Sequence, residues 1–365
     1  MFVRQPIQIK SEPRNGGWRE WTGVINGNEW VSCLHADRQG VLWIGTSVGR
    51  VLTRRGEEWG VEVELEPQVT GVAVESTNRV WLSTGDGIRL LDRQGNNQWR
   101  VTPFRTYYQG APGLVSGGYG AGFDAERLWG YVDGVYVPPL KKSHYAPFVI
   151  SAEHGLFSWG GYHGVWHHFL PHYWGANSEW LDTRTLIPHR RPTCMIEDGA
   201  GNLWVGTEGD GLVRFNAPAR DYCERAPEHN QKDFTEFAFF AARDLRCEFT
   251  AVQALAPSAD PRSVWSLLTG SDRRSHIALF DGQQWSTLPL AHKANCVREI
   301  AARVALVGLN SGHFELARVD IAEKTVERVE PPGTQGYITH IVDAANGRFF
   351  CASRLALFEK EEGLR

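Results

Sequence analysis

The sequence predicts an all-β protein, and three features of its 365 residues support this fold class. The composition is rich in glycine and tryptophan, with 39 Gly and 15 Trp but only 2 Met. Helical bundles disfavour Gly, whereas turn-rich β-proteins use it at positive φ and place Trp on their sheets. Short apolar or alternating runs are separated by tight-turn sequences along the whole chain. One of these runs also repeats, so self-comparison decides the architecture.

The repeated run is clearest at residues 40–46 (GVLWIGT), 202–207 (NLWVGT) and 79–84 (RVWLST). Weaker copies complete a series of aromatic or leucine markers: Trp43, Trp81, Trp129, Phe157, Trp204, Trp265, Leu306 and Phe350. The markers are about 44 residues apart on average, which is typical of four-stranded propeller blades. Aromatic residues that recur at one point of every blade bury apolar area between sheets, so we expect these markers to be structural.

The repeat predicts a β-propeller of seven or eight blades. Eight markers favour eight blades, but the short interval between Trp129 and Phe157 favours seven, with residues 128–170 forming one irregular blade. An isolated fourth-strand motif at residues 16–21 precedes the first full unit, whereas the last unit ends after a third strand at residues 355–359. We therefore expect the N-terminal strand to complete the C-terminal blade and close the ring.

The chain is expected to form a single propeller domain over residues 1–365, with insertion-like segments at 103–123 and 217–246. In the second segment, residues 233–243 (DFTEFAFFAAR) fit either a short amphipathic helix or a long outer strand, and the helix is preferred.

Residues 198–215 (DGAGNLWVGTEGDGLVRF) and 37–46 (DRQGVLWIGT) resemble the two-component regulator propeller repeat. Its pattern is an Asp-x-x-Gly turn, then Leu-Trp-Ile-Gly-Thr, then Gly-Leu and a third strand. In that family such propellers often form the periplasmic sensor of a membrane histidine kinase, with a second propeller, a transmembrane helix and a kinase attached. Those parts are not recognisable here, so the resemblance implies the fold rather than the sensor role.

Charge and cysteine usage limit the partners. The net charge of −4 provides no global attraction for nucleic acid or an anionic membrane. The N-terminal residues lack the apolar core of a signal peptide, and no later stretch is apolar for long enough to cross a bilayer. The six cysteines form no Cys-x-x-Cys pair and are expected to be buried free thiols. We therefore expect a soluble, cytoplasmic protein without a cofactor.

Functional groups are expected on one face of the propeller. The loops from second to third strands and from fourth strands to the next blade emerge on that face, where a rigid scaffold holds them. The predicted binding residues there are His144, His163, His189, Arg190, Arg191, Glu208, Asp210, Arg273, Arg274, His276, His292, Lys293, His313 and Tyr337. This set would bind an acidic surface of a partner protein or a polar or anionic ligand. The alternative is that exposed loops simply collect polar residues.

A histidine-rich segment, residues 163–172 (HGVWHHFLPH), has spacing that resembles a metal site. Neighbouring side chains of a strand face opposite ways, so a bulge or turn would be needed to bring two of them to one ion. The weak candidates are His163, His167, His168 and His172; a sheet surface carrying imidazoles is favoured, and no metal is expected.

The preferred function is a protein-interaction or ligand-recognition module, as a subunit of a larger bacterial assembly. The alternative is a propeller enzyme, a lyase or hydrolase, that uses His, Arg and acidic residues at the channel mouth and is possibly metal-assisted. No Gly-x-Ser-x-Gly or His-Glu-x-x-His motif is present to support that alternative. Asp198 occupies the turn of the repeat, where it is expected to accept backbone N–H bonds rather than act as an acid or base.

Overall fold

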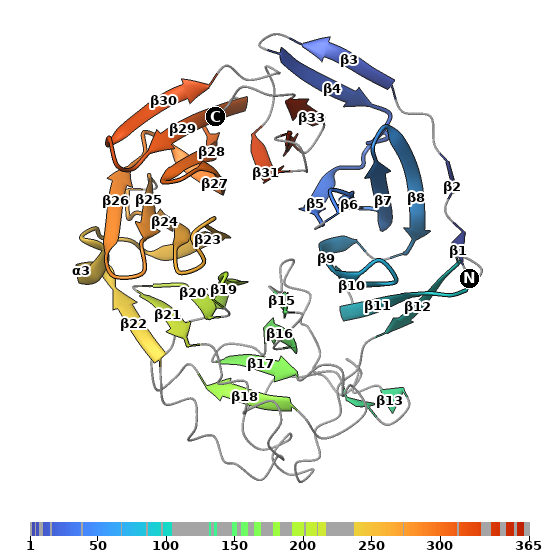
Figure 1. The fold of residues 1–365 in the computed structure, drawn as a ribbon, viewed down its shortest axis with the longest axis horizontal. Coiled ribbons are helices and arrows are strands. Elements are labelled where there is room, and N and C mark those ends of the chain that lie inside the picture. The colour runs from blue at the N-terminus through green and yellow to red at the C-terminus, as the bar shows by residue number, and fades with distance from the viewer. Residues whose placement is uncertain are drawn as a thin grey trace.

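The structure is a computed structural model, and it describes residues 2–3, 5–6, 10–14, 17–37, 39–66, 68–84, 87–95, 98–103, 131–132, 135–136, 148–151, 155–159, 164–168, 178–182, 192–200, 202–209, 211–216, 237–272, 274–311, 314–329, 337–343, 348–353 and 356–360. These residues form almost entirely β-structure, which confirms the predicted all-β class. Figure 1 shows the four- and five-stranded sheets set around a common centre, and the innermost strands are those at residues 31–36, 69–76, 148–151, 192–197, 251–257, 293–301 and 338–343.

Four of the described sheets consist of four consecutive antiparallel strands. They are β15 (Phe148–Ser151), β16 (Gly155–Trp159), β17 (Gly164–His168) and β18 (Ser178–Asp182); β19 (Pro192–Glu197), β20 (Leu203–Thr207), β21 (Gly211–Phe215) and β22 (Phe237–Ala241); β23 (Ala251–Pro257), β24 (Val264–Thr269), β25 (Ser275–Phe280) and β26 (Trp285–Pro289); and β27 (Lys293–Ala301), β28 (Val304–Asn310), β29 (Phe314–Asp320) and β30 (Thr325–Val329). A two-stranded ribbon, β13 (Tyr131–Val132) and β14 (Val135–Tyr136), lies between the third and fourth repeat markers, Trp129 and Phe157, in the chain.

Three further sheets have five strands, because N-terminal segments extend their edges. The first holds β5 (Val31–Ala36), β6 (Leu42–Thr46), β7 (Arg50–Arg55), β8 (Glu58–Glu64) and β2 (Gln5–Pro6); the second holds β9 (Val69–Ser76), β10 (Arg79–Thr84), β11 (Gly87–Arg93), β12 (Gln98–Pro103) and β1 (Phe2–Val3); the third holds β31 (Ile338–Asp343), β32 (Phe349–Ser353), β33 (Leu357–Lys360), β4 (Trp18–Thr22) and β3 (Lys10–Arg14). The addition of β1, β2 and β3 was not expected from the sequence.

The N-terminal and C-terminal strands share one sheet. β4 pairs antiparallel with β33, so that Trp21 lies opposite Leu357 and Trp18 lies opposite Lys360. A buried ion pair also links this sheet to the first one, because Arg54 Nη1 on β7 lies 2.8 Å from Glu359 Oε1 on β33. The strand expected to complete the last unit therefore occupies the predicted position.

The expectation of a helix over residues 233–243 was wrong for its described part. Residues 237–241 form β22, the fourth strand of the β19–β22 sheet, and α3 (Ala242–Leu245) covers only the next turn. Phe240 stacks on Trp204 with ring centroids 5.5 Å apart. This tertiary contact favours the strand over the local helical pattern. The segment 217–246 thus includes a regular strand, whereas residues 104–123 of the other predicted insertion lie outside the described residues.

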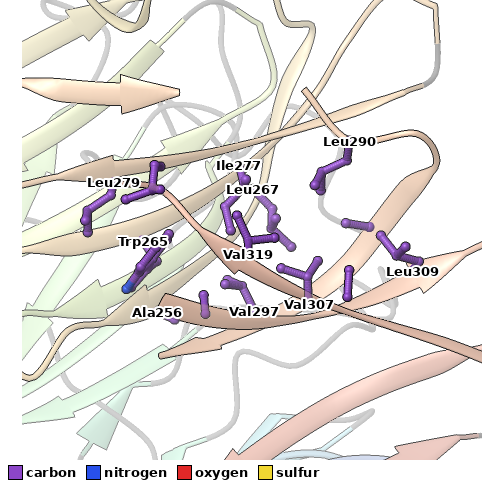
Figure 2. Packing of buried hydrophobic residues seen from close by; sticks show 14 residues of the cluster. Ala256, Trp265, Leu267, Ile277, Leu279, Leu290, Val297, Val307, Leu309 and Val319 are labelled. Atoms are coloured by element: carbon purple, nitrogen blue, oxygen red, sulfur yellow. The ribbon is translucent and has the colours of Figure 1, made fainter. Parts of the chain in front are cut away.

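The core consists of apolar clusters packed between neighbouring sheets. Figure 2 shows one of them, in which Trp265 and Leu267 of β24 face Val297 of β27 and Val307 of β28. Five of the repeat markers belong to these clusters: Trp43, Trp204, Trp265, Leu306 and Phe350. A sixth marker, Trp81, is fully buried as well. Their structural role is therefore confirmed.

Each strong repeat turn is held by its aspartate. Asp198 Oδ1 accepts the backbone N–H groups of Ala200 and Asn202, and its Oδ2 accepts the indole Nε1–H of Trp204 at 2.8 Å. Asp37 makes the same contact with Trp43 at 3.1 Å. The aspartate thus joins the turn to the buried marker, which is a structural role and not that of an acid or base.

A second repeated contact joins neighbouring sheets at their inner strands. Cys194 faces Gly206, and a Cβ on that glycine would lie 2.6 Å from Cys194 Sγ and 2.6 Å from Val252 of the next sheet. The same arrangement recurs at Gly45 and Gly308. The glycine is required here because the next sheet approaches too closely for any side chain. The sequence signature of this contact is a Cys followed by a Gly twelve residues later, and the aromatic repeat markers did not reveal it.

Candidate functional site

The structure describes part of the predicted binding face. It places Glu208 after β20, Arg274 and His276 around the start of β25, His292 and Lys293 at the start of β27, and Tyr337 before β31. The remaining predicted residues lie outside the described ones: His144, His163, His189, Arg190, Arg191, Asp210, Arg273 and His313. Of the weak metal candidates, His167 and His168 lie on β17, whose backbone alone is described, and His163 and His172 lie outside the described residues.

A continuous series of backbone hydrogen bonds joins the loops that carry five of these residues. Gly209 N donates to Thr250 O at 2.7 Å, and Thr250 N donates to Thr269 O at 2.7 Å. In the next loops, Gly270 N donates to Arg274 O at 2.7 Å and Ser275 N to His292 O at 3.4 Å.

The loops after β20, β24 and β26 therefore form one connected surface, called the loop face below. Its predicted residues are Glu208, Arg274, His276, His292 and Lys293.

The side chains of the loop face are mainly basic and accessible. Arg274, His292 and Lys293 are exposed. The guanidinium of Arg274 lies 3.7 Å from the carboxylate of Asp272, but both side chains are more than half exposed, so this ion pair contributes little to stability. Glu208 is exposed as well, at the far end of the surface. A rigid loop surface with three basic or imidazole side chains is suited to an acidic partner.

The inner strand β31 places a neutral histidine near the centre of the molecule. His340 lies opposite Ala352, at the position where other sheets have the Cys and Gly pair. Its Nδ1 lies 2.9 Å from Thr339 Oγ1. Burial lowers the pKa of His340 to about 4, although a hydrogen bond with the backbone of Ser32 acts in the opposite direction. His340 is therefore uncharged at neutral pH, and the sequence had not singled it out.

The described cysteines are free thiols, as predicted. Burial raises the pKa of Cys33, Cys194 and Cys296 to about 12 and that of Cys247 to about 11. These thiols remain protonated at neutral pH and are poor nucleophiles. Within the described part of the chain, no three His, Cys, Asp or Glu side chains are arranged to hold a metal ion.

A cavity of about 650 Å³ lies beside the outermost strand of the β23–β26 sheet. Its lining residues come from α3 and the residues after it, from the loop after β24, from β26 and from the turn after β29. They are Leu245, Arg246, Cys247, Glu248, Gly270, Ser271, Asp272, His276, Gln284, Trp285, Ser286, Thr287, Leu288, Pro289, Ile321 and Lys324. His276 is thus the predicted residue that the structure brings into a pocket.

Four-stranded antiparallel sheets around a centre, with connected loops on one face, define a propeller-like protein. The sequence agrees with this class, since residues 25–48 and 186–209 each match the two component regulator propeller family. The chain therefore carries repeats of that family, at the two sites where the repeat pattern is strongest. A search of the curated proteins finds no match to the sequence.

Solved structures with a similar fold come from several kinds of protein. YCF48 from Cyanidioschyzon merolae has a TM-score of 0.60 at 11% identity, over 95% of this chain and 99% of that one. Virginiamycin B lyase from Staphylococcus aureus has a TM-score of 0.62 at 8% identity, over 98% and 99%. The extracellular domain of a putative hybrid two component system from B. thetaiotaomicron has a TM-score of 0.58 at 12% identity, over 98% of this chain and 40% of that one. At these identities the likeness establishes the fold alone.

No helix in the described part of the chain has the length and apolar character needed to cross a membrane.

Proposed function

We propose that this chain is a closed, seven-bladed β-propeller of one domain, residues 1–365, and that it works as a recognition module for another protein. Seven blades are supported by the seven described sheets of four or five strands, since the β13–β14 ribbon has only two. Closure is supported by the pairing of β4 with β33 and by the hydrogen bond between His340 and the backbone of Ser32, which joins the last sheet to the first.

The observation that carries the recognition role is the loop face. Loops of the neighbouring β19–β22 and β23–β26 sheets are connected through their backbones, and Arg274, His292 and Lys293 project from them into solvent. Because these loops are fixed before binding, little conformational entropy is lost on association. The proposed partner presents an acidic surface, and the complex weakens as ionic strength rises.

One similar propeller supports a binding role, because YCF48 has been solved bound to D1 peptide. The proposed module is a subunit of a larger bacterial assembly in the cytoplasm. Its free, protonated thiols support a reducing compartment.

The proposal is tested by capture of a partner from cells that produce the protein. The variant combines Arg274→Ala, His292→Ala and Lys293→Ala. A matched control combines Arg262→Ala with Arg303→Ala, two exposed basic residues in turns between first and second strands, on the opposite face. We expect the wild type and the control to retain the same partner and the loop-face variant to lose it. Equal capture by all three proteins would refute the role of the loop face.

The alternative is a propeller enzyme of the lyase or hydrolase type, with Glu208, Arg274, His276 and His292 as the reacting residues. It is supported by the similarity in fold to virginiamycin B lyase. A bound metal or small ligand in the purified protein, together with loss of that ligand in the loop-face variant, would favour this alternative over the binding role.

A further inference from the structure

Exposed apolar side chains gather at one end of the β5–β8 sheet. In the described part of the chain four large hydrophobic side chains are exposed, and two of them, Trp30 and Val48, lie here. They are 37% and 51% exposed. Trp30 directly precedes β5, and Val48 lies in the turn between β6 and β7. In this sheet, these are the loops that correspond to those of the loop face.

Backbone hydrogen bonds join the loops that carry these side chains. Trp30 N donates to Ser47 Oγ at 3.1 Å, and Ser47 N donates to Trp30 O at 3.0 Å. On the other side of Val48, Gly49 O accepts the N–H of Leu65, in the connection from β8 to β9, at 3.0 Å. The three loops therefore form one connected surface, called the Trp30 patch below. Its loops are residues 22–30, 46–50 and 64–66.

A buried ion pair supports the patch from below. Arg50 Nε donates to Glu29 Oε1 at 2.8 Å, and Arg50 Nη2 donates to Val24 O at 2.8 Å. The side chain of Arg50 is 14% exposed and that of Glu29 is 4% exposed, while Val24 belongs to the apolar core. The loop before β5 is therefore held in place before a partner arrives, which lowers the entropy cost of binding.

The accessible charge of the patch is acidic. Glu29 and Arg50 neutralise each other, and the other charged residues of these loops are Glu64 and Glu66, both exposed. Leu65, between the two glutamates, packs against an apolar core cluster and so fixes their segment. An exposed indole thus lies on a surface with two carboxylates, whereas the loop face is basic.

The repeat does not require apolar side chains at these positions. The other strong repeat aligns with this one through the equivalent pairing of its first and second strands. At the position of Trp30 its sequence has Arg191, and at the position of Val48 it has Gly209. The exposed apolar pair is therefore a feature of this sheet and not of the fold, and such patches mark sites of interaction.

We propose that the Trp30 patch is a docking site for a segment of a partner protein in which an apolar side chain is flanked by Lys or Arg. The apolar side chain packs against Trp30 and Val48, and the basic side chains pair with Glu64 and Glu66. Fixed tryptophans are typical anchors of protein interfaces, and their indole faces also attract cations. The site uses other loops and the opposite charge, so it does not depend on the proposed role of the loop face.

The test begins with random heptapeptides displayed on phage and selected against the full chain. We expect enrichment of peptides with an apolar residue next to Lys or Arg. The most enriched peptide of this kind is then labelled, and its affinity is measured by fluorescence anisotropy. The same peptide with Glu in place of its basic residues should bind at least about tenfold more weakly. Enrichment of acidic peptides alone, or of none, overturns the proposal.

Variants locate the binding site on the protein. Trp30→Ser with Val48→Ser removes the apolar pair, and Glu64→Gln with Glu66→Gln removes the acidic charge. We expect each double variant to weaken binding at least about tenfold, because an anchor or its charged neighbours are missing. Trp30→Phe keeps an aromatic anchor and should stay within about threefold of the wild type.

Matched controls make the same kinds of change elsewhere. Val326→Ser removes an apolar side chain of β30 that is 45% exposed. Glu323→Gln with Glu327→Gln removes two exposed carboxylates near the same strand. Both controls are expected to bind the peptide as the wild type does, and urea unfolding checks that all the variants are folded.

Two further results separate this proposal from the role of the loop face. The loop-face variant of Arg274, His292 and Lys293 is expected to bind the basic peptide normally, so failure of one site does not imply failure of the other. Binding should also weaken as the salt concentration rises. Equal binding by the wild type and both double variants of the patch would show that the peptide docks elsewhere and that the proposal is wrong.

Discussion

The buried carboxylate of Glu359 provides a quantitative test of the junction between the first and last sheets. Glu359 is fully buried and accepts hydrogen bonds from Trp21 Nε1 at 2.9 Å, Arg54 Nη1 at 2.8 Å and Arg348 Nη1 at 3.2 Å. Arg54 is only 3% exposed, and its other acidic partner, Glu57, is mostly in solvent. The substitution Glu359→Gln therefore leaves a buried guanidinium without a buried counter-charge.

Removing one partner of a buried ion pair costs about 3–5 kcal/mol. We expect that loss for Glu359→Gln and a similar one for Arg54→Met, measured as the free energy of unfolding in urea. The double variant should be more stable than the sum of the two single losses indicates, because neither charge then remains buried alone.

An exposed pair in another sheet is the control for this cycle. Arg318 Nη1 lies 3.7 Å from Glu327 Oε2, with the side chains 31% and 63% exposed. Arg318→Met and Glu327→Gln should each cost less than about 1 kcal/mol. A cost below about 1 kcal/mol for Glu359→Gln, or strict additivity in the double variant, would refute the reasoning that this pair is buried and joins the two sheets.

Three further perturbations test other parts of the structure. Gly206→Ala places a Cβ 2.6 Å from Cys194 Sγ, and we expect a loss of about 1–3 kcal/mol in thermal or urea unfolding that Cys194→Ala partly restores. Asp198→Ala leaves the buried indole Nε1–H of Trp204 without its acceptor and should cost about 1–3 kcal/mol. His340 has a pKa of about 4 in the folded protein, below the usual 6.5, so the unfolded state binds more protons between these values. Stability is therefore full above pH 6.5 and falls as the pH drops toward 4.

Each of these predictions has a result that contradicts it. A stable Gly206→Ala protein that gains nothing from Cys194→Ala would mean that the sheets do not approach closely there. An unchanged free energy of unfolding for Asp198→Ala would show that the hydrogen bond between Asp198 and Trp204 does not stabilise the fold. For the histidine, the His340→Gln variant should lose less stability than the wild type on acidification from pH 6.5 to 4, and parallel pH profiles would show that another group titrates.

The parts of the fold that were predictable from sequence depend on short-range contacts. The sequence around Asp198 carries its own turn acceptor, and Trp204 lies six residues later, so the turn and the buried marker are visible together. The long-range pairing of residues 18–22 with the C-terminal sheet is an exception, and it was predicted by counting strands in the first and last units.

The unpredicted parts depend on long-range contacts. β1 and β2 are two residues each, which is too short to show alternation, and they are held by strands far along the chain. Residues 237–241 (FAFFA) fit both the two-residue period of a strand and the 3.6-residue period of a helix. The strand is favoured by the stacking of Phe240 against Trp204. Local patterns cannot decide such cases, because tertiary packing outweighs propensity.

The candidate surfaces were likewise predictable in part from the order of strands, whereas the contacts between distant segments were not. Strand order sufficed to assign Arg274 and His292 to neighbouring loops, since both follow from counting strands within a repeat. The backbone hydrogen bonds that connect those loops are made by Gly209, Thr250 and Gly270, whose side chains carry no signal of the contact. The cavity beside β26 was not predictable, because its walls come from three separate parts of the chain. These are residues 245–248, residues between 270 and 289, and residues 321 and 324.

Photo-crosslinking inside cells that produce the protein would show whether the loop face binds a partner protein. A photoreactive amino acid is placed at His292 on the loop face or at Arg303 on the opposite face. A defined protein adduct from position 292, with none from position 303, is the predicted result. Adducts from position 303 alone, or none from position 292, would contradict the claim.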